Sequence, residues 1–315
     1  MAEYDHPVVS DAFDLLAKNT ELSLVEYTSI TKSQADIERY LMQHIGTIST
    51  VLYGAFSRKT ITSPLPGSII DMLVVYRGDE VKREHPSDIF ARLCDVLIKP
   101  AFESFIIEGQ NALMLPRHGF HFKIHPAYAL AQHTYMLPDP NFNEWAKYDI
   151  TSFNDIFVKE NVRHKGKLTA MVRMVKTWNR VSGNLFNGYY LELMVTDVLS
   201  NFEITSYPEA LCHIFRRAVA EVVFEQKDPA NIEFEIEGLD NLEDVVEAMK
   251  LLKRSFKLAE EAIELEQENN TKKALENWNK LFPQVLPTQL DMIVGKARNS
   301  GIKGADALRM MIDQK

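Results

Sequence analysis

Cysteine is scarce in this chain, and the two that occur lie far apart. Cys94 and Cys212 are the only cysteines among 315 residues. Two isolated thiols cannot build a disulfide framework or supply most of a zinc site, so the sequence excludes those classes of protein. Their low number favours a reducing compartment, and we expect a cytoplasmic protein.

A long apolar run and an excess of positive charge are also missing. No stretch approaches the roughly 18 consecutive apolar residues that a membrane-spanning helix needs, and the first residues, MAEYDHPVVSDAFDLL, do not resemble a signal peptide. The net charge of −9 argues against a surface built for nucleic-acid backbones, because such a surface needs a basic field. We therefore expect no membrane partner and no broad nucleic-acid surface.

What the chain does contain is enough apolar sequence for a sizeable core, with 46% hydrophobic residues. Apolar periodicity over the first part predicts alternating helices and strands. The expected helices are Val8–Lys18, Ser33–Ile45 (capped at Thr31 or Ser33) and Pro86–Leu97. The expected strands are Thr47–Tyr53, Ile69–Tyr76 and the segment Ser104–Ala127, interrupted near Gly109 and at Pro116–Gly119.

Beyond about Ala129 the pattern changes: a connector at Leu137–Trp145 leads into sequence with helical spacing. The helices expected there are Leu168–Trp178, Tyr189–Leu199, Pro208–Val223, Asn241–Leu265, Lys272–Phe282 and a short one at Ala305–Met311. The fourth carries an apolar stripe from Leu242 to Ile263, and Asp240 with Glu243 forms an approximate capping box. The sequence predicts an α+β fold, with an α/β lobe at residues 1–164, a helical lobe at residues 165–315 and a cleft between them. The N-terminal helices are free to pack on both lobes.

The most informative motif is GAFSRKT, beginning at Gly54, followed by SIIDMLVVY, ending at Tyr76. These segments resemble the active-site signature of the DNA-polymerase-β-type nucleotidyltransferases, in which a Gly-Ser turn precedes a strand carrying two acids at i and i+2. Alternate residues of a strand point the same way, so such acids can share a metal. Here Ala55 stands at the Ser position, Ile69 stands at the first acid position, and Asp71 remains.

The third acid of that family falls at Lys123, in FKIHPAY. Polymerases hold two divalent ions with three carboxylates, so this replacement reverses the charge where a cation would sit. Two accounts stay open: Lys123 pairs with Asp71 in an inactive site, or Lys123 contacts a phosphate in place of the metal. A metal cluster of His118, His121 and His125 is a further alternative, but no carboxylate or Cys is spaced to complete it.

A second resemblance covers the helical part. LTAMVRMVKTWNR (Leu168–Arg180) and GYYLELMVTDVL (Gly188–Leu199) resemble the helical-lobe signature of the oligoadenylate synthetases and of the bacterial cGAS/DncV-like nucleotidyltransferases, or CD-NTases, of anti-phage signalling. The resemblance implies a polymerase-β-type lobe followed by a helical lobe. It also implies that Lys176 contacts a nucleotide triphosphate and Tyr189 stacks on the base, with Gly188 replacing the usual Ser or Gln. The candidate nucleotide-binding residues are therefore Gly54, Ala55, Ser57, Lys123, Lys176 and Tyr189, with no metal site.

Purely structural roles are open for the helical candidates. Lys176 is compatible with an exposed helix face or with an ion pair to Glu192. Tyr189 is followed by Tyr190, and one of these two rings has to face the core.

We expect a catalytically degenerate CD-NTase-like protein that binds a nucleotide, an oligonucleotide or a protein partner without turnover, and no cofactor. The first alternative is an active nucleotidyltransferase that makes a nucleotide second messenger with a non-standard magnesium site, using acids such as Asp79, Glu80 or Glu108. The second is an antitoxin-like or scaffold subunit, with a protein effector or a homologue as its partner and no nucleotide role.

Overall fold

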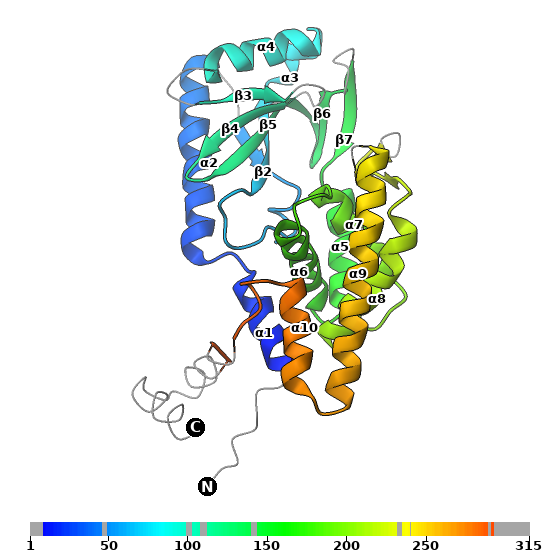
Figure 1. Cartoon of the computed structure of the whole chain (residues 1–315). Coiled ribbons are helices and arrows are strands. Elements are labelled where there is room, and N and C mark those ends of the chain that lie inside the picture. The colour runs from blue at the N-terminus through cyan, green and yellow to red at the C-terminus, as the bar shows by residue number, and fades with distance from the viewer. Residues whose placement is uncertain are drawn as a thin grey trace, which may run out of the picture. The chain divides into compact units, whose positions relative to one another are not determined.

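The computed structural model describes residues 9–45, 49–98, 103–107, 112–139, 144–231, 235–239, 241–288 and 291–292 (Figure 1). The chain forms two compact units. The sheet unit comprises residues 21–163 and 226–236, and the helical unit comprises residues 1–20, 164–225 and 237–315. The border between residues 163 and 164 lies one residue before the expected one, and residues 1–20 and 226–236 each belong to the unit on the other side of it. The helix expected at Ala305–Met311 lies outside the described residues.

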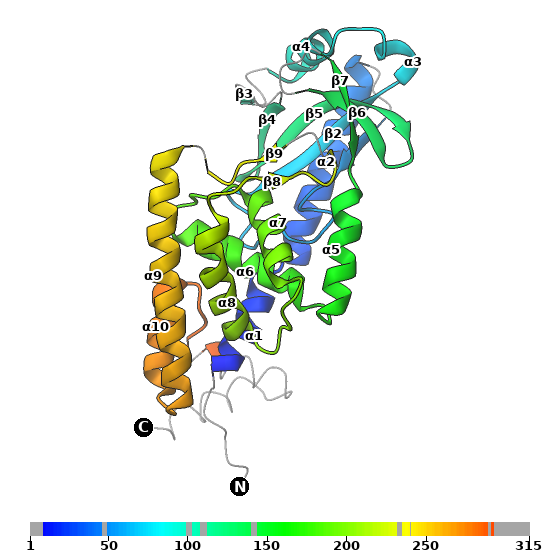
Figure 2. The ribbon, with the colours of Figure 1, turned by 90° about the vertical axis from the view of Figure 1, so that its right-hand side faces the viewer.

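The sheet unit is built on a seven-stranded mixed sheet with the order β1-β2-β5-β4-β3, extended from β5 by β6 and β7. Strands β2 and β5 are parallel, and the other pairs are antiparallel. The strands are β1 Ser49–Leu52, β2 Ile69–Tyr76, β3 Phe105–Ile107, β4 Ala112–Arg117, β5 Phe120–Ala131, β6 Thr134–Pro138 and β7 Trp145–Asp149. The helices of this unit are α2 Leu24–Ile45, α3 Gly78–Val81, α4 Pro86–Leu97 and α5 Ser152–Arg163, and residues 226–236 add a small hairpin of β8 Gln226–Lys227 and β9 Glu235–Ile236 (Figure 2).

Strand β2 is buried on both faces over most of its length, as its continuous apolar run predicts. Ile70, Met72 and Val74 join a core cluster with buried residues of α2 and α4. Leu73 and Val75 face the other side and join Tyr53, Ala127 and Leu137. The part of β2 that is accessible to solvent is its start, where Ile69 is 50% exposed.

Helix α2 begins nine residues before the expected Ser33, so the predicted cap at Thr31 or Ser33 was wrong. Ser23 and Glu26 form a capping box in which the Ser23 backbone N–H donates to the Glu26 carboxylate (2.8 Å) and the Glu26 N–H donates to Ser23 Oγ (3.2 Å). The Thr31 hydroxyl instead donates to the Tyr27 carbonyl, one helical turn back. The S-x-x-E pattern at this point is a local signal that identifies the helix start.

The segment interpreted as a connector is partly strand. β6 and β7 form an antiparallel pair, and β6 also pairs with the end of β5. Asp228, in the turn of the β8–β9 hairpin, accepts a hydrogen bond from the Tyr148 hydroxyl (2.9 Å), and the Asp149 N–H donates to the Ala230 carbonyl (3.1 Å). Residues 226–236 therefore belong to the sheet unit through contacts that are remote in sequence.

The helical unit consists of α1 Val9–Asn19, α6 Lys167–Val181, α7 Gly188–Leu199, α8 Tyr207–Glu221, α9 Leu242–Gln267 and α10 Thr271–Leu281. Helix α6 packs against α1, α7 and α8, and α9 packs against α8 and α10 (Figure 2). Trp178 and Trp278 are its largest fully buried side chains. Trp178 packs against Phe215 with ring centroids 4.9 Å apart, and its indole N–H donates to Ser255 Oγ (3.1 Å).

Helix α9 buries a face that coincides only in part with its predicted apolar stripe, through Leu252 and Ala259. Leu242 is 77% exposed and Val246 is 46% exposed, while the fully or nearly buried positions are Ala248, Leu252, Ser255, Ala259 and Ala262. Small side chains allow close approach of neighbouring helices, and Ser255 is needed for the Trp178 hydrogen bond. The N-cap is Asn241, whose side chain accepts from the Asp244 N–H, and not the expected Asp240. No described helix is both long enough and apolar enough to cross a membrane.

Candidate functional site

The turn after β1 is the first part of the candidate site. Gly54 has φ +63°, a conformation that glycine adopts without steric cost. A Cβ on Gly54 would lie only 2.7 Å from Asp71 Oδ2, so the carboxylate lies directly against the turn. The Tyr53 N–H donates to the Asp71 carbonyl (3.2 Å), which joins the turn to β2. The structure therefore brings together the two residues that the motif singled out.

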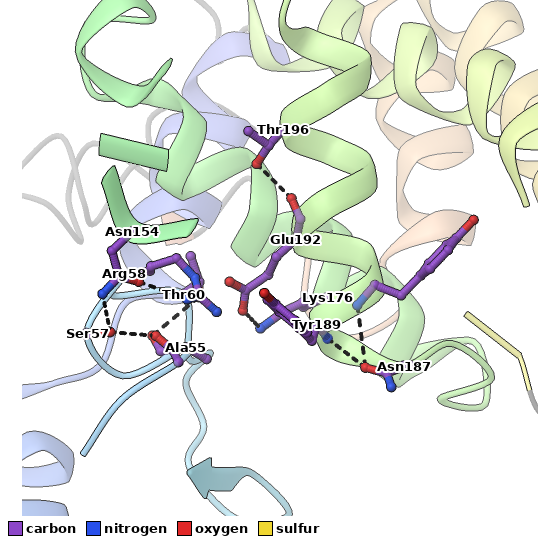
Figure 3. Close-up of polar contacts among 12 residues, drawn as sticks. Ala55, Ser57, Arg58, Thr60, Asn154, Lys176, Asn187, Tyr189, Glu192 and Thr196 are labelled. Atoms are coloured by element: carbon purple, nitrogen blue, oxygen red, sulfur yellow. Dashed lines mark hydrogen bonds and ion pairs between the residues drawn. The ribbon is translucent and has the colours of Figure 1, made fainter. Parts of the chain in front are cut away.

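The rest of the turn is held by its own hydrogen bonds (Figure 3). The Ala55 carbonyl accepts from the Thr60 N–H (2.9 Å) and from the Thr60 hydroxyl (3.3 Å). The Gly54 carbonyl accepts from the Arg58 N–H (3.2 Å) and from Ser57 Oγ (2.9 Å). The Ser57 hydroxyl, the candidate phosphate donor, thus gives its single proton to the turn itself.

Asn154 of α5, which is distant in sequence, forms hydrogen bonds with two residues of this turn. Its amide donates to Ser57 Oγ (3.0 Å) and accepts from Arg58 Nη1 (2.9 Å), as Figure 3 shows. Arg58 is 7% exposed, and its guanidinium lies 4.7 Å from the centre of the Phe153 ring. Arg58 and Asn154 were not among the predicted site residues, because no local pattern links residues so far apart.

The stretch between the turn and β2 is tied to α2 by Glu26. Its carboxylate accepts from the Leu65 N–H (2.7 Å) and from the Ser63 hydroxyl (3.0 Å), in addition to Ser23. Burial raises the pKa of Glu26, but the hydrogen bonds from Ser23, Leu65 and Ser63 outweigh it and lower the pKa below its ordinary value. One carboxylate therefore both caps α2 and anchors the approach to Asp71.

The register of β2 and β5 places the three family acid positions next to one another. Asp71 is paired with Lys123, and Ile69 and Leu73 of the same face are paired with His121 and His125. The three positions at which the family resemblance predicts acids thus carry one hydrocarbon, one carboxylate and one amine. The register makes Asp71 and Lys123 neighbours on adjacent strands; an ion pair between their side chains stays a prediction.

Two magnesium ions, which this fold implies, do not fit this donor set. The Ile69 side chain has no ligand atom, and the Lys123 ammonium would repel a cation. No described group of three or more His, Cys, Asp or Glu side chains, including His118, His121 and His125, is arranged to hold a metal.

Among the described residues, the other candidate acids form no metal-binding group. Asp79 and Glu80 of α3 form exposed ion pairs with Arg77 (3.4 and 3.2 Å), and hydrogen bonding to Arg77 lowers the pKa of Asp79. Glu108 lies outside the described residues.

Lys176 and Glu192 meet inside the helical unit. The Lys176 ammonium of α6 is in direct contact with Glu192 Oε1 of α7 (Figure 3), and the two side chains are 15% and 1% exposed. A Cβ on Gly188 would lie 3.7 Å from Lys176 Cε, so the lysine passes close over the start of α7. The ion pair, one of the structural roles that the sequence left open, is present.

The structure also distinguishes the two tyrosines of α7. Asn187 caps the helix by accepting from the Tyr189 N–H (2.8 Å) and the Tyr190 N–H (3.4 Å). Tyr190 is fully buried, and its hydroxyl lies 2.9 Å from the Glu221 carbonyl. Tyr189 is only partly buried, so it is the ring that retains accessible surface. Its stacking on a base stays a prediction.

Comparison with known proteins agrees with this geometry. Residues 8–161 match the Second Messenger Oligonucleotide or Dinucleotide Synthetase domain. A probable cyclic nucleotide synthase from Bacillus cereus is 22% identical over 331 residues, covering 90% of this chain and 98% of that protein. The chain belongs to the CD-NTase family.

Solved structures of CD-NTases share the fold of this chain. Escherichia coli CdnC, solved in complex with HORMA-deltaN, matches with a TM-score of 0.68 at 16% identity, covering 90% of this chain and 99% of CdnC. CdnC with ATP gives a TM-score of 0.67 at 16% identity, with coverage of 90% and 100%. Bradyrhizobium diazoefficiens CdnG in complex with GTP gives 0.61 at 12% identity, with coverage of 88% and 99%. This CD-NTase therefore has the nucleotidyltransferase fold.

Proposed function

We propose that this CD-NTase binds a nucleotide or an oligonucleotide without turning it over. The observation that carries the proposal is the β2–β5 register, because it makes Ile69, Asp71 and Lys123 adjacent on one face of the sheet. Phosphoryl transfer depends on ions that neutralise the charge developing on the phosphates. A site with one carboxylate beside an amine lacks the means to hold those ions, so we expect binding without transfer.

Two lysines and one tyrosine among the candidate residues favour a phosphate-bearing ligand. Lys123 is a partly exposed cation on β5, where it can donate to a phosphate without a metal. In the helical unit, Lys176 carries an ammonium and Tyr189 a partly exposed ring on which a base can stack. The solved structures of CdnC with ATP and of CdnG with GTP support a nucleotide as the ligand class. We place this function in the cytoplasm, in bacterial anti-phage signalling.

Two other functions have one observation each in their favour. The Bacillus cereus relative is named a probable cyclic nucleotide synthase, which favours an active enzyme with a metal site other than the family's own. The complex of CdnC with HORMA-deltaN favours a role in which a protein partner is the ligand. Titration of the protein with nucleotides distinguishes both functions from the proposal.

The proposal is tested by calorimetric titration of the purified full chain with ATP and GTP, once with magnesium and once with a chelator. We expect binding that survives the chelator. Binding that requires magnesium would overturn the proposal in favour of an active enzyme, which incubation with nucleotides and product analysis would then identify. Absence of binding in both conditions would leave the protein-partner function.

Two variants assign the phosphate contacts. Lys123→Met and Lys176→Ala should each weaken ATP binding by about ten- to a hundredfold, since hydrogen bonds to charged groups contribute about 1.5–3 kcal/mol. Lys176→Ala leaves Glu192 buried without its cation, so thermal unfolding of this variant and of Lys176→Ala/Glu192→Gln serves as the control for folding. Lys257→Ala, on the exposed face of α9, should bind like the wild type.

A further inference from the structure

Lys176 and Glu192 form an ion pair with no net charge, so a ligand that contacts the Lys176 ammonium also meets the Glu192 carboxylate. Its ammonium contacts Glu192 Oε1, and the Glu192 side chain is 1% exposed. Glu192 lies on α7 among buried residues, including Leu191, Leu193 and Met194. Because neither charge is well solvated, salt screens the pair only weakly.

We infer that Glu192 sets the anion affinity of the helical unit by neutralising Lys176. This inference rests on the proposed function, in which Lys176 contacts the phosphates of the ligand. An ammonium has three N–H donors, and one of them is already directed at Glu192. An incoming phosphate is attracted by Lys176 and repelled by the carboxylate beside it, so the pair binds an anion far more weakly than a lone lysine would.

The Lys176 side chain crosses the start of α7 beside Gly188. A Cβ on Gly188 would lie 3.7 Å from Lys176 Cε and 3.9 Å from Lys176 Nζ, which is ordinary van der Waals contact. The positive end of the α7 dipole lies at the same point and disfavours a cation. Glu192, one turn further along α7, compensates for that unfavourable position and holds the ammonium there.

The inference predicts which ligands respond to removal of the carboxylate. Glu192→Gln keeps the shape of the side chain and an acceptor oxygen but removes the negative charge. We expect this variant to bind ATP and inorganic tripolyphosphate at least tenfold more tightly than the wild type does. Adenosine, which has no phosphate, should bind both proteins with affinities that differ by less than a factor of two.

The matched control is Glu261→Gln. Glu261 forms a 3.9 Å ion pair with Lys257 on the exposed face of α9 in the same unit, and its substitution changes the net charge by the same amount. We expect this control to change the affinity for ATP by less than a factor of two. An equal gain in the two variants would show that overall charge, and not the Lys176 pair, controls binding.

Calorimetry of the full chain in chelator decides between the outcomes. Unchanged or weaker ATP binding by Glu192→Gln would overturn the inference, because the carboxylate would then orient Lys176 and not compete with the ligand. An equal gain for adenosine would overturn it as well. Glu192→Met, which is similar in volume, provides a second uncharged variant if Glu192→Gln shows a lowered unfolding temperature.

The same data separate this inference from the proposed function. If the wild type binds ATP and loses it on Lys176→Ala, but Glu192→Gln gains nothing, only the inference fails. If Glu192→Gln binds tripolyphosphate and the wild type binds neither ATP nor tripolyphosphate, the inference stands and nucleotide binding by the wild type fails. If neither protein binds any phosphate ligand, both fail.

Discussion

Position 54 has two requirements that only glycine, among the amino acids, meets together. Its φ of +63° lies in the left-handed region, where a side chain costs about 1–2 kcal/mol. Its missing side chain also leaves room for the Asp71 carboxylate, 2.7 Å from where a Cβ would be. A single glycine thus determines both the path of the turn and the position of the remaining acid.

Gly54→Ala should lower the free energy of unfolding by more than the backbone strain alone, by about 2–3 kcal/mol. Gly67→Ala is the matched control, because Gly67 has φ +82° with open space where the Cβ would lie, and should cost about 1 kcal/mol. Urea unfolding measures both. In an Asp71→Ala background the excess at Gly54 should disappear; equal costs for the two glycines would contradict the close approach of Asp71.

Helices α2 and α5 position the turn after β1, which begins at Gly54. Glu26 links the start of α2 to Ser63 and Leu65, and Asn154 links α5 to Ser57 and Arg58. Both helices therefore determine where the turn and the start of β2 lie, although neither contributes a family motif.

The Glu26 anchor should make stability depend on pH. The folded state lowers the pKa of Glu26, so the unfolded chain binds the proton more readily. The contribution is complete above the unfolded pKa of about 4.3 and is lost as the pH falls through the lower folded value. Glu26→Gln should therefore be less stable than the wild type at pH 7, with the difference shrinking below about pH 4.

Denaturant midpoints from pH 3 to pH 7 check this expectation. Glu247→Gln, an exposed position on α9, is the control and should follow the wild-type curve. A difference for Glu26→Gln that persists unchanged at pH 3 would mean that the carboxylate charge contributes nothing to the anchor.

Helices α1 and α10, which lie near the two ends of the described chain, pack against each other in the helical unit. Phe13 of α1 is fully buried and packs edge-on against Trp278 of α10, with ring centroids 4.9 Å apart, and against Phe282 at 6.2 Å. Figure 1 shows α1 beside α10. The unit is thus assembled from segments about 260 residues apart in sequence.

Phe13→Ala should lower the free energy of unfolding by about 3–5 kcal/mol, the usual cost of emptying a buried aromatic position. Hydrogen exchange should show faster exchange in α10 as well as in α1, because the two helices share this contact. Phe105→Ala, at a 51% exposed position, should have little effect. Unchanged protection of α10 would contradict a shared core.

Much of the fold follows from local sequence. β2 and α4 begin and end where apolar spacing and a proline in the first turn predict. The start of α9 was predicted to within one residue, although its cap is Asn241 and not Asp240. The start of α2 is also encoded locally, by Ser23 with Glu26, but the competing caps Thr31 and Ser33 obscured it. β6 and β7 were missed because Pro and Asn residues near them favoured a connector.

Local sequence alone predicts Ile69, Asp71 and Lys123 at the acid positions of the family, because alternate residues of a strand share a face and the motif spacing is local. The tertiary structure, in contrast, determines that Ser57 is hydrogen-bonded to Asn154, that Lys176 pairs with Glu192, and that Tyr190 and not Tyr189 enters the core. It also decided which face of α9 is buried and that residues 9–19 complete the helical unit. These outcomes depend on contacts between residues distant in sequence, which no local periodicity encodes.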